Sequence, residues 1–223
     1  MIYPINEIFH TIQGEGLYTG IPAIFIRFQG CPVNCSWCDT KYTWKKLKSR
    51  IGLLEDILSK KTENNIWCYL SSTFIVKIIE RQKWNINHIV ITGGEPSIYD
   101  LRPLTFALEK AGFFCQLETS GTYKIYCSEK TWVTVSPKIN VNKDYPILSQ
   151  PLFRSDEIKY LVENENDINL LDSILLQVND NKKRIISLQP VSCSQIATDI
   201  CIKNCISHNW HLSIQTHKYL SIK

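Results

Sequence analysis

The chain has 223 residues, of which 25 are lysine or arginine and 21 are aspartate or glutamate, so its formal charge is only +4. A surplus this small does not indicate a nucleic-acid-binding protein, and we expect no direct nucleic-acid partner. The length suits a single α/β domain over residues 1–223, and no stretch approaches the ~20 apolar residues of a membrane helix, so we expect no membrane association.

The nine cysteines indicate a reducing environment. The N-terminal stretch Met1–Glu7 lacks the basic start and apolar run of a secretory signal. An odd number of cysteines without an export signal is typical of reduced thiols rather than of a disulfide framework. We therefore expect a cytoplasmic protein.

Short apolar runs alternate with helical patterns along the chain. The runs typical of buried strands are residues 22–29, 88–92, 114–119, 132–136, 157–162, 184–189 and 211–215. Apolar residues at helical spacing lie between several of them: Ile75, Ile78 and Ile79; Leu101, Leu104 and Leu108; Ile168, Leu171, Ile174 and Leu175; and Ile196 and Ile200. This alternation predicts a parallel sheet covered by helices. Fewer than eight units are visible, and the link 121–131 is too short for a crossover helix, so we predict an incomplete (β/α) barrel.

Three cysteines follow the first of these runs with the spacing C-x3-C-x2-C: Cys31, Cys35 and Cys38. A structural zinc site takes four protein ligands, and no fourth thiol lies nearby in the sequence. A four-iron cluster normally takes four cysteines, so three leave one iron open to bind a molecule such as S-adenosylmethionine. The spacing resembles that of the radical S-adenosylmethionine superfamily. Ordinary core cysteines or a degenerate zinc knuckle are the alternatives.

Residues 41–65 fit no barrel unit. The segment begins with the basic residues Lys41, Lys45, Lys46, Lys48 and Arg50, continues with a short amphipathic pattern and ends in a polar run. We expect an insertion that follows the loop of the three cysteines (the cysteine loop) and packs on the outside of the barrel. Its lysines are either a solvated face or a rim that steers an acidic electron donor.

Polar and glycine-rich loops follow four later strands, where ligands gather in parallel α/β barrels. They are residues 92–96, 118–121, 136–138 and 189–192. The two glycines of the first loop allow close approach of the backbone to a ligand. Gly94 and Lys138 offer a carbonyl and a cation to the amino and carboxylate groups of a bound methionine moiety.

Taken together, these motifs resemble one family of that superfamily. The matching residues are Gln13–Gly16, Arg27, the cysteine loop with Asp39 and Thr40, Thr92–Pro96, Ser136–Lys138 and Gln215–Lys218. The set is similar to the 7-carboxy-7-deazaguanine synthases, lyases of purine metabolism that make a precursor for queuosine modification of tRNA. The resemblance implies conversion of 6-carboxy-5,6,7,8-tetrahydropterin with loss of ammonia, a [4Fe–4S] cluster, S-adenosylmethionine, Mg²⁺, a flavodoxin-like electron donor and a homodimer.

The resemblance also implies a role for individual residues. Cys31, Cys35 and Cys38 correspond to the catalytic cluster ligands, and Thr40 corresponds to the Mg²⁺ ligand. The cofactor site corresponds to Trp37, Gly94, Ser136, Pro137, Lys138, Gln189, Pro190, Val191 and Ser192. The substrate site corresponds to Ile12, Gln13, Gly14, Glu15, Arg27, Thr92 and His217.

Several of these residues have a structural alternative. Glu15 is equally expected as a turn residue, and Thr40 as a helix cap. His217 lies near the end of the sequence, where a surface histidine is more common than a ligand. Arg27 lies in an apolar strand, where it would face the lumen beside Gln29, and its alternative is an ion pair with a glutamate of the barrel.

Two other functions stay open. An activating enzyme that places a radical on a partner protein often carries further C-x2-C pairs, which are absent here. A metal-binding RNA-interaction module would use the Lys41–Arg50 run but expects aromatic platforms and a broader basic face. Cys193, Cys201 and Cys205 suggest either a second metal site or ordinary buried packing.

Overall fold

The computed structural model describes residues 1–60, 62–139, 141–178, 180–192 and 194–222. Within these ranges, nine strands form one sheet in the order β3-β1-β2-β4-β5-β6-β7-β8-β9. They are β1 (Ile2–Ile12), β2 (Pro22–Phe28), β3 (Cys68–Ser71), β4 (His88–Gly93), β5 (Phe114–Thr119), β6 (Trp132–Val135), β7 (Glu157–Val162), β8 (Ile185–Pro190) and β9 (His211–Leu212).

The helices are α1 (Leu54–Leu58), α2 (Ser72–Gln82), α3 (Arg102–Lys110), α4 (Ser149–Arg154), α5 (Glu165–Gln177), α6 (Gln195–His208) and α7 (Thr216–Leu220), with 3₁₀ turns η1 (Lys41–Thr43), η2 (Lys48–Arg50) and η3 (Pro96–Ile98). In the described part of the chain, none of them has the length and apolar character to cross a membrane.

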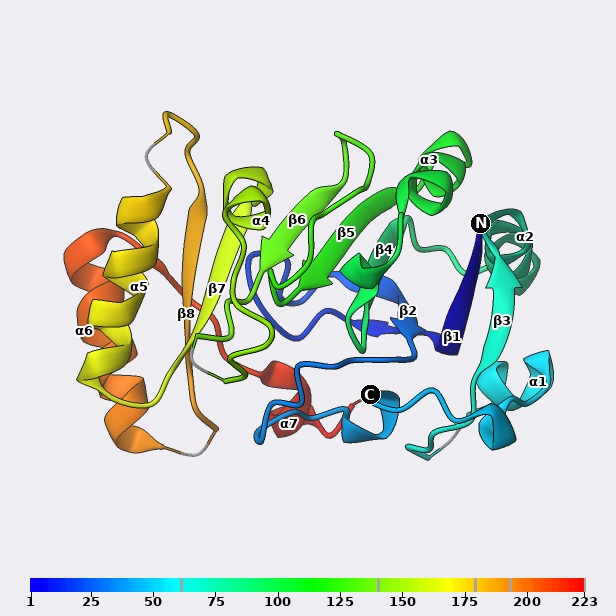
Figure 1. Ribbon diagram of the computed structural model, residues 1–223, viewed down its shortest axis with the longest axis horizontal. Coiled ribbons are helices and arrows are strands. Elements are labelled where there is room, and N and C mark those ends of the chain that lie inside the picture. Colours follow the sequence, from blue (N-terminus) through cyan, green and yellow to red (C-terminus); the bar gives the residue numbers. More distant parts are fainter. Residues whose placement is uncertain (61, 140, 179, 193, 223) are drawn as a thin grey trace.

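The sheet is an open, incomplete barrel, as predicted. Every pair from β2 to β9 is parallel, whereas β1 pairs antiparallel with both β2 and β3. No pairing between described residues joins β9 to β3, so the barrel does not close. The arrowheads of β5 and β6 point toward the side where α7 and the segment after β2 lie (Figure 1). The carboxyl ends of the parallel strands therefore face these two segments.

All seven predicted strands are present, and the link 121–131 contains no helix, as expected. The last strand is shorter than predicted because the chain leaves the sheet after Leu212. The sequence interpretation missed β1 and β3. In β1 the polar residues Asn6, Glu7 and His10 interrupt the apolar run, and β3 has only 4 residues.

A bulge in β1 sets which side chains face the cavity and which face the helices. Ile5 pairs with Phe28 and Glu7 with Arg27, so Asn6 is an extra residue on the β1 side. Ile5 and Ile8 both reach the hydrophobic core although they are three residues apart. The bulge therefore lets two consecutive polar residues, Asn6 and Glu7, be buried without interrupting the core.

The cysteines of α6 belong to that core. Cys201 and Cys205 are buried, and burial raises the pKa of Cys201 to about 12. These observations favour packing over a second metal site. Cys193, the third cysteine of that hypothesis, lies outside the described residues.

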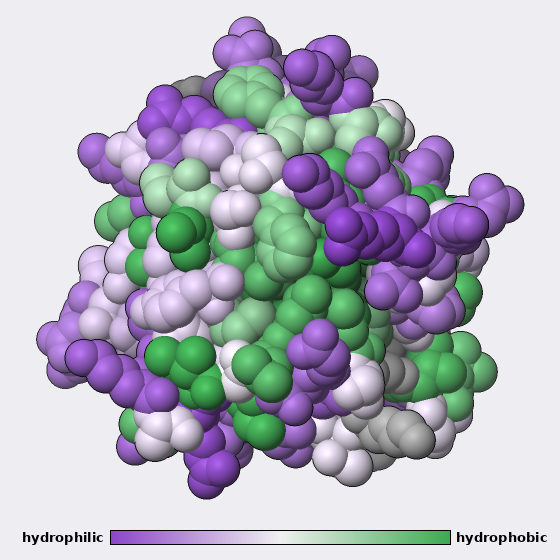
Figure 2. Space-filling view, turned by 90° about the vertical axis from the view of Figure 1, so that its right-hand side faces the viewer, coloured by the Kyte–Doolittle hydropathy of each residue, from purple (hydrophilic) through white to green (hydrophobic). Residues whose placement is uncertain are grey.

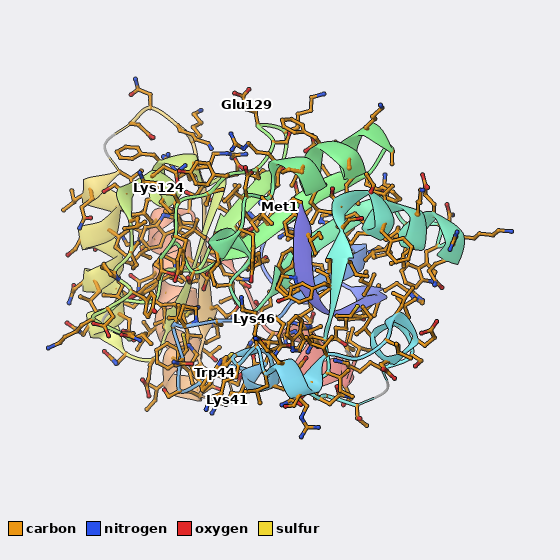
Figure 3. All side chains as sticks on the ribbon, turned by 45° about the vertical axis from the view of Figure 1, so that its right-hand side comes forward. Met1, Lys41, Trp44, Lys46, Lys124 and Glu129 are labelled. Atoms are coloured by element: carbon orange, nitrogen blue, oxygen red, sulfur yellow. The ribbon has the colours of Figure 1, made fainter. Side chains whose placement is uncertain are left out.

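The segment 41–65 is not a barrel unit, as predicted, but its expected position on the outside is wrong in part. Tyr42 and Glu63 line the central cavity. Figure 3 shows Lys41, Trp44 and Lys46 following one another along one side of the barrel, remote from Glu129. The segment therefore supplies one wall of the site as well as an outer cover.

Candidate active site

One large cavity, of about 1180 Å³, lies among the loops at the carboxyl ends of the strands. It gathers every predicted site residue except Pro190: Ile12, Gln13, Gly14, Glu15, Arg27, Cys31, Cys35, Trp37, Cys38, Thr40, Thr92, Gly94, Ser136, Pro137, Lys138, Gln189, Val191, Ser192 and His217. Pro190 does not line the cavity, because it alternates with Gln189 and Val191 along the end of β8 and turns to the other face.

The cysteine loop forms one wall of this cavity. Its base is closed by bonds from Gly30 N to the Thr43 carbonyl (2.6 Å) and from Cys31 N to the Trp44 carbonyl (3.0 Å). All three thiols are free, and no other described cysteine lines the cavity. Burial raises the pKa of Cys31 to about 11, which disfavours a role as a free thiolate nucleophile. Three thiols on one cavity wall fit a cluster with one open iron.

The Gly-Gly-Glu-Pro loop after β4 packs directly against the cysteine loop. A Cβ atom on Gly94 would lie 2.2 Å from the Gly30 carbonyl oxygen, so only glycine fits there. Glu95 is buried, and its carboxylate accepts bonds from Ser97 N (3.0 Å), Thr119 Oγ1 (2.6 Å) and Ser120 N (2.8 Å). Glu95 therefore joins the loops after β4 and β5, and it also lines the cavity beside the cysteine loop.

Lys138 places a cation beside the cysteine loop. Its Nζ donates to Ser136 Oγ at 2.8 Å. Burial lowers the pKa of this lysine, and the neighbouring Cys35 opposes that shift. Lys138 therefore lies beside the cysteine loop, and its expected role as the cation for the carboxylate of a methionine moiety stays a prediction.

Arg27 combines the two roles that the sequence left open. Its Nε donates to Glu7 Oε1 at 2.7 Å, which is the ion pair of the structural alternative. The guanidinium also lines the cavity, and neither terminal nitrogen bonds to another residue within the described ranges. The two terminal nitrogens of the planar guanidinium can thus donate two parallel hydrogen bonds to a carboxylate.

A second charged cluster surrounds Lys159 of β7, which the sequence interpretation missed. Lys159 Nζ lies 2.7 Å from Glu15 Oε2 and 2.9 Å from Glu118 Oε2. Burial alone would raise the pKa of Glu15, but Lys159 and Gln215 lower it to about 2. Glu118 responds differently, because burial and the nearby Glu157 and Glu15 outweigh Lys159 and raise its pKa to about 7. The missed signal was a lysine inside an apolar strand, the same feature that identified Arg27.

We expect the pKa of Glu118 to make stability depend on pH. A carboxyl group whose pKa is raised in the fold contributes its stability fully below the unfolded value of about 4.5, and loses it as pH rises toward 7. Glu118→Gln removes this titration, so its free energy of unfolding relative to wild type should increase between pH 5 and pH 8, by up to about 3 kcal/mol. Urea unfolding of both proteins across this range measures the difference. A difference that does not change with pH would contradict the assignment.

The segment after β9 ties three loops together at the cavity. Gln215 Nε2 donates to Glu15 Oε1 (2.8 Å) and to Asp39 Oδ2 (3.1 Å), and Lys218 Nζ lies 3.0 Å from Asp39 Oδ1. Lys218 also donates to Ser192 Oγ at 2.9 Å. Residues 215–218 therefore contact three loops: the loop after β1 with Glu15, the cysteine loop with Asp39, and the loop after β8 with Ser192. Of these four residues, only His217 was assigned a role from the sequence.

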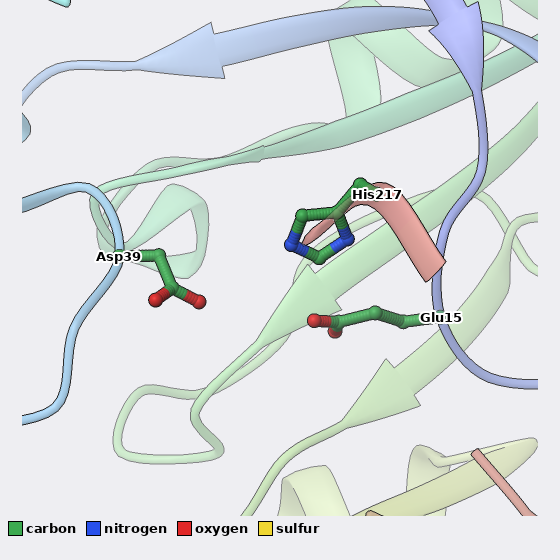
Figure 4. A group of neighbouring side chains, drawn as sticks. All are labelled: Glu15, Asp39 and His217. Carbon is green, nitrogen blue, oxygen red and sulfur yellow. The ribbon is translucent and has the colours of Figure 1, made fainter. Parts of the chain in front are cut away.

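Glu15, Asp39 and His217 point toward one another, and one ligand atom of each lies within 4.8 Å of the others (Figure 4). This spacing suits a cation, but Glu15 and Asp39 are already neutralised by Lys159 and Lys218. The group is better described as an ion-pair network than as a metal centre. Thr40, the expected Mg²⁺ ligand, has its Oγ1 3.6 Å from Cys38 Sγ. It occupies the N-cap position of the η1 turn, as the structural alternative expected, but its side chain makes no capping bond there.

The cavity as a whole therefore has two halves. One holds three thiols, glycine-rich backbone and Lys138. The other holds an arginine fork and acidic side chains that accept N–H groups. The first half can bind an iron–sulfur cluster with one open iron and a cofactor that carries amino and carboxylate groups. The second half can bind a small substrate that carries both a carboxylate and N–H donors.

Comparisons with known proteins agree with this arrangement. The Radical SAM superfamily model matches residues 25–138. A 7-carboxy-7-deazaguanine synthase from Escherichia coli is 55% identical over 222 residues, and one from Buchnera aphidicola is 53% identical over 223 residues, each covering 100% of both chains. A crystal structure of QueE from Escherichia coli superposes with a TM-score of 0.94 at 54% identity, covering 96% of this chain and 94% of that one. The chain thus belongs to the radical SAM superfamily and, within it, to the 7-carboxy-7-deazaguanine synthase family.

Proposed function

We propose that this protein converts 6-carboxy-5,6,7,8-tetrahydropterin to 7-carboxy-7-deazaguanine with loss of ammonia, on the route to queuosine. The observation that carries the proposal is the single cavity in which the three-thiol loop and the Arg27 fork lie together. When bound, the reduced [4Fe–4S] cluster and S-adenosylmethionine supply the radical that takes a hydrogen atom from C6 of the pterin, after which the ring contracts.

The cluster half of the cavity supports the cofactor assignments. Cys31, Cys35 and Cys38 would hold three irons, and the fourth iron would remain open to the amino and carboxylate groups of S-adenosylmethionine. The backbone of Gly94 and the ammonium group of Lys138 line the cavity beside the cysteine loop. The remaining cofactor contacts would come from Trp37, Ser136, Pro137, Gln189, Val191 and Ser192.

The charged half of the cavity supports the substrate assignment. The carboxylate of the pterin complements the terminal nitrogens of Arg27. The amino and ring N–H groups of the pterin need acceptors, which Glu15 and Glu118 provide, while Lys159 holds both carboxylates in place. The other substrate contacts would come from Ile12, Gln13, Gly14, Thr92 and His217.

A Mg²⁺ ion would complete the site at Thr40. Magnesium takes oxygen ligands and keeps several waters, so one threonine hydroxyl together with the substrate carboxylate is a suitable set. Thr40 lines the cavity next to the third cysteine, which agrees with this role. Thr40 would hold the ion, and the ion would supply a positive charge for the carboxylate that Arg27 also binds.

The test is anaerobic reconstitution of the cluster followed by incubation with S-adenosylmethionine and dithionite. Formation of methionine and 5′-deoxyadenosine would establish the radical chemistry, and addition of the carboxypterin should then give the deazapurine. An activating enzyme for a partner protein would cleave the cofactor but leave the pterin unchanged. An RNA-binding module would do neither.

We propose that an acidic electron-donor protein of the flavodoxin kind docks on the basic segment after the cysteine loop. Lys41, Lys45, Lys48 and Arg50 are exposed there. Lys46 is exposed as well, but its Nζ is held by the Tyr99 hydroxyl, to which it donates at 2.7 Å. The segment borders the cluster through the bond from Cys31 N to the Trp44 carbonyl, so a docked donor would lie near the iron.

Replacing Lys45, Lys48 and Arg50 with serine should slow turnover with a flavodoxin about tenfold at low salt and weaken its salt dependence. Turnover driven by dithionite should not change, because a small reductant needs no docking surface. The matched control replaces the exposed Lys77, Lys110 and Lys130, which removes equal charge elsewhere. Equal slowing by both triple variants would contradict specific docking.

We further propose a cytoplasmic homodimer. Exposed apolar side chains gather where β3 leaves an open sheet edge: Met1, Ile2, Ile51, Leu53 and Tyr69. Figure 2 shows apolar surface gathered on this side of the molecule, bordered by hydrophilic side chains. Such a patch is typical of a protein interface. Sedimentation should give twice the chain mass, and Leu53→Glu with Tyr69→Glu should give the monomer.

A further inference from the structure

A buried polar network joins residues 41–66 to the strands beneath the cysteine loop. Gln29 is fully buried, and its Nε2 donates to the carbonyl oxygens of Tyr42 (3.0 Å) and Lys45 (2.9 Å). Its Oε1 accepts a bond of 2.7 Å from Asn6 Nδ2, and Asn6 Oδ1 accepts one of 2.9 Å from Lys60 Nζ. Because buried polar groups stabilise a fold only when they are paired, this network specifies one arrangement of the segment.

The far end of the segment belongs to the same network. Lys60 Nζ donates to the carbonyl oxygens of Asn64 (3.2 Å) and Ile66 (2.8 Å), and Asn6 Nδ2 lies 3.2 Å from both oxygens. Asn6 can reach them because it is the extra residue of the β1 bulge. Both ends of the segment are therefore fixed by two side chains that bond to each other, Asn6 of β1 and Gln29 directly after β2.

Residues 42–45 connect this network to both halves of the cavity. On the cluster side, the carbonyls of Thr43 and Trp44 accept the bonds from Gly30 N and Cys31 N. On the substrate side, the Tyr42 hydroxyl donates to Glu7 Oε1 at 3.2 Å, and the same oxygen accepts from Arg27 Nε. A shift of this short stretch would move the cysteine loop and the partner of Arg27 together.

We propose that Gln29 and Tyr42 are positioning residues that fix the cysteine loop relative to Arg27. They thereby determine how many deazapurine molecules are formed for each S-adenosylmethionine cleaved. This inference rests on the proposed function. A misplacement of about 1 Å between reacting groups can cost on the order of 100-fold in rate. A loosened network should therefore release more 5′-deoxyadenosine for each deazapurine formed, even when the cluster is fully loaded.

The experiment compares Gln29→Met and Tyr42→Phe with two matched controls, Gln177→Met and Tyr126→Phe. The controls make the same chemical changes at exposed positions outside the cavity. Gln29→Met should raise the ratio of 5′-deoxyadenosine to deazapurine at least threefold. The milder Tyr42→Phe should raise the KM for the carboxypterin about three- to tenfold with kcat little changed, as expected for the loss of one hydrogen bond. Iron content should remain that of wild type in Tyr42→Phe.

Amide hydrogen exchange of the pterin-free proteins supplies a readout that does not depend on turnover. Gln29→Met should speed exchange in peptides covering residues 28–46 and leave those of β7 and β8 unchanged. Unchanged protection of residues 28–46 overturns the inference, and so does faster exchange with a wild-type product ratio, because the network would then serve stability alone. Absence of deazapurine formation by wild type would contradict the proposed function, while the exchange result would still decide whether the network holds the loop.

Discussion

Cys31→Ala, Cys35→Ala and Cys38→Ala are each expected to abolish formation of 5′-deoxyadenosine and of deazapurine. Each thiol would hold one iron, and no other described cysteine lines the cavity to replace it. Loss of a ligand from a site with no spare donor removes the cluster rather than weakening it. Iron and sulfide analysis after anaerobic reconstitution, together with the visible absorption of the cluster, measures the loss directly.

Cys201→Ser is the control for these variants. Cys201 is buried in the core on α6, away from the cavity, so this substitution should lower stability slightly and leave iron content and turnover unchanged. Loss of iron from Cys201→Ser would support the second metal site. A full four-iron spectrum in any one of the three loop variants would show that its thiol is not a ligand.

Arg27→Ala should weaken use of the carboxypterin by about 2–5 kcal/mol, because the buried carboxylate of the substrate would lose the guanidinium that pairs with it. Arg27→Lys keeps the charge but not the fork, so it should recover only part of this loss. The measurement is kcat/KM for the carboxypterin, compared with that for the same pterin without its carboxylate. The variants should lose activity mainly on the carboxylated compound.

The ion pair with Glu7 decides which Arg27 variant is the more informative. Glu7 is buried, so Arg27→Ala removes the cation beside a buried carboxylate and should also destabilise the fold. Arg27→Lys can still pair with Glu7 and thus separates the two effects. Iron content and pterin-free cleavage of S-adenosylmethionine should stay near wild type in Arg27→Lys. If both compounds were affected equally by Arg27→Lys, the ion pair with Glu7 would be the main role of the arginine.

Much of the fold could be predicted because its parallel strands are buried on both faces and stand out as apolar runs. β4, with the sequence HIVITG, is of this kind. β1 could not be found in this way, since its bulge places Asn6 and Glu7 in succession inside the molecule. A bulge changes the alternation of side chains locally, and the sequence shows only a polar interruption.

The site was predictable where a residue has a fixed place in a short motif, such as Gly94 or Lys138. Lys159 and Tyr42 were missed, and Glu118 was placed in a ligand-binding loop without a role, because their roles depend on which strands become neighbours. Lys159 contacts Glu15 across 144 positions of the chain, and Tyr42 contacts Glu7 across 35. Such partners are set by the closing of the sheet and by the path of residues 41–66, neither of which leaves a local pattern.

The bonds between residues 215–218 and the loop after β1 have a consequence for the order of folding. Thr216 contacts the Gly14 carbonyl across 202 positions, and Gln215 contacts Glu15 across 200. Closing so long a loop is entropically costly and slow compared with pairing neighbouring strands. A chain emerging from the ribosome can therefore assemble β1 to β8 and expose its three thiols while the cavity still lacks one wall. Iron and sulfide would have their widest access to the cysteine loop during that interval, before residues 215–218 dock.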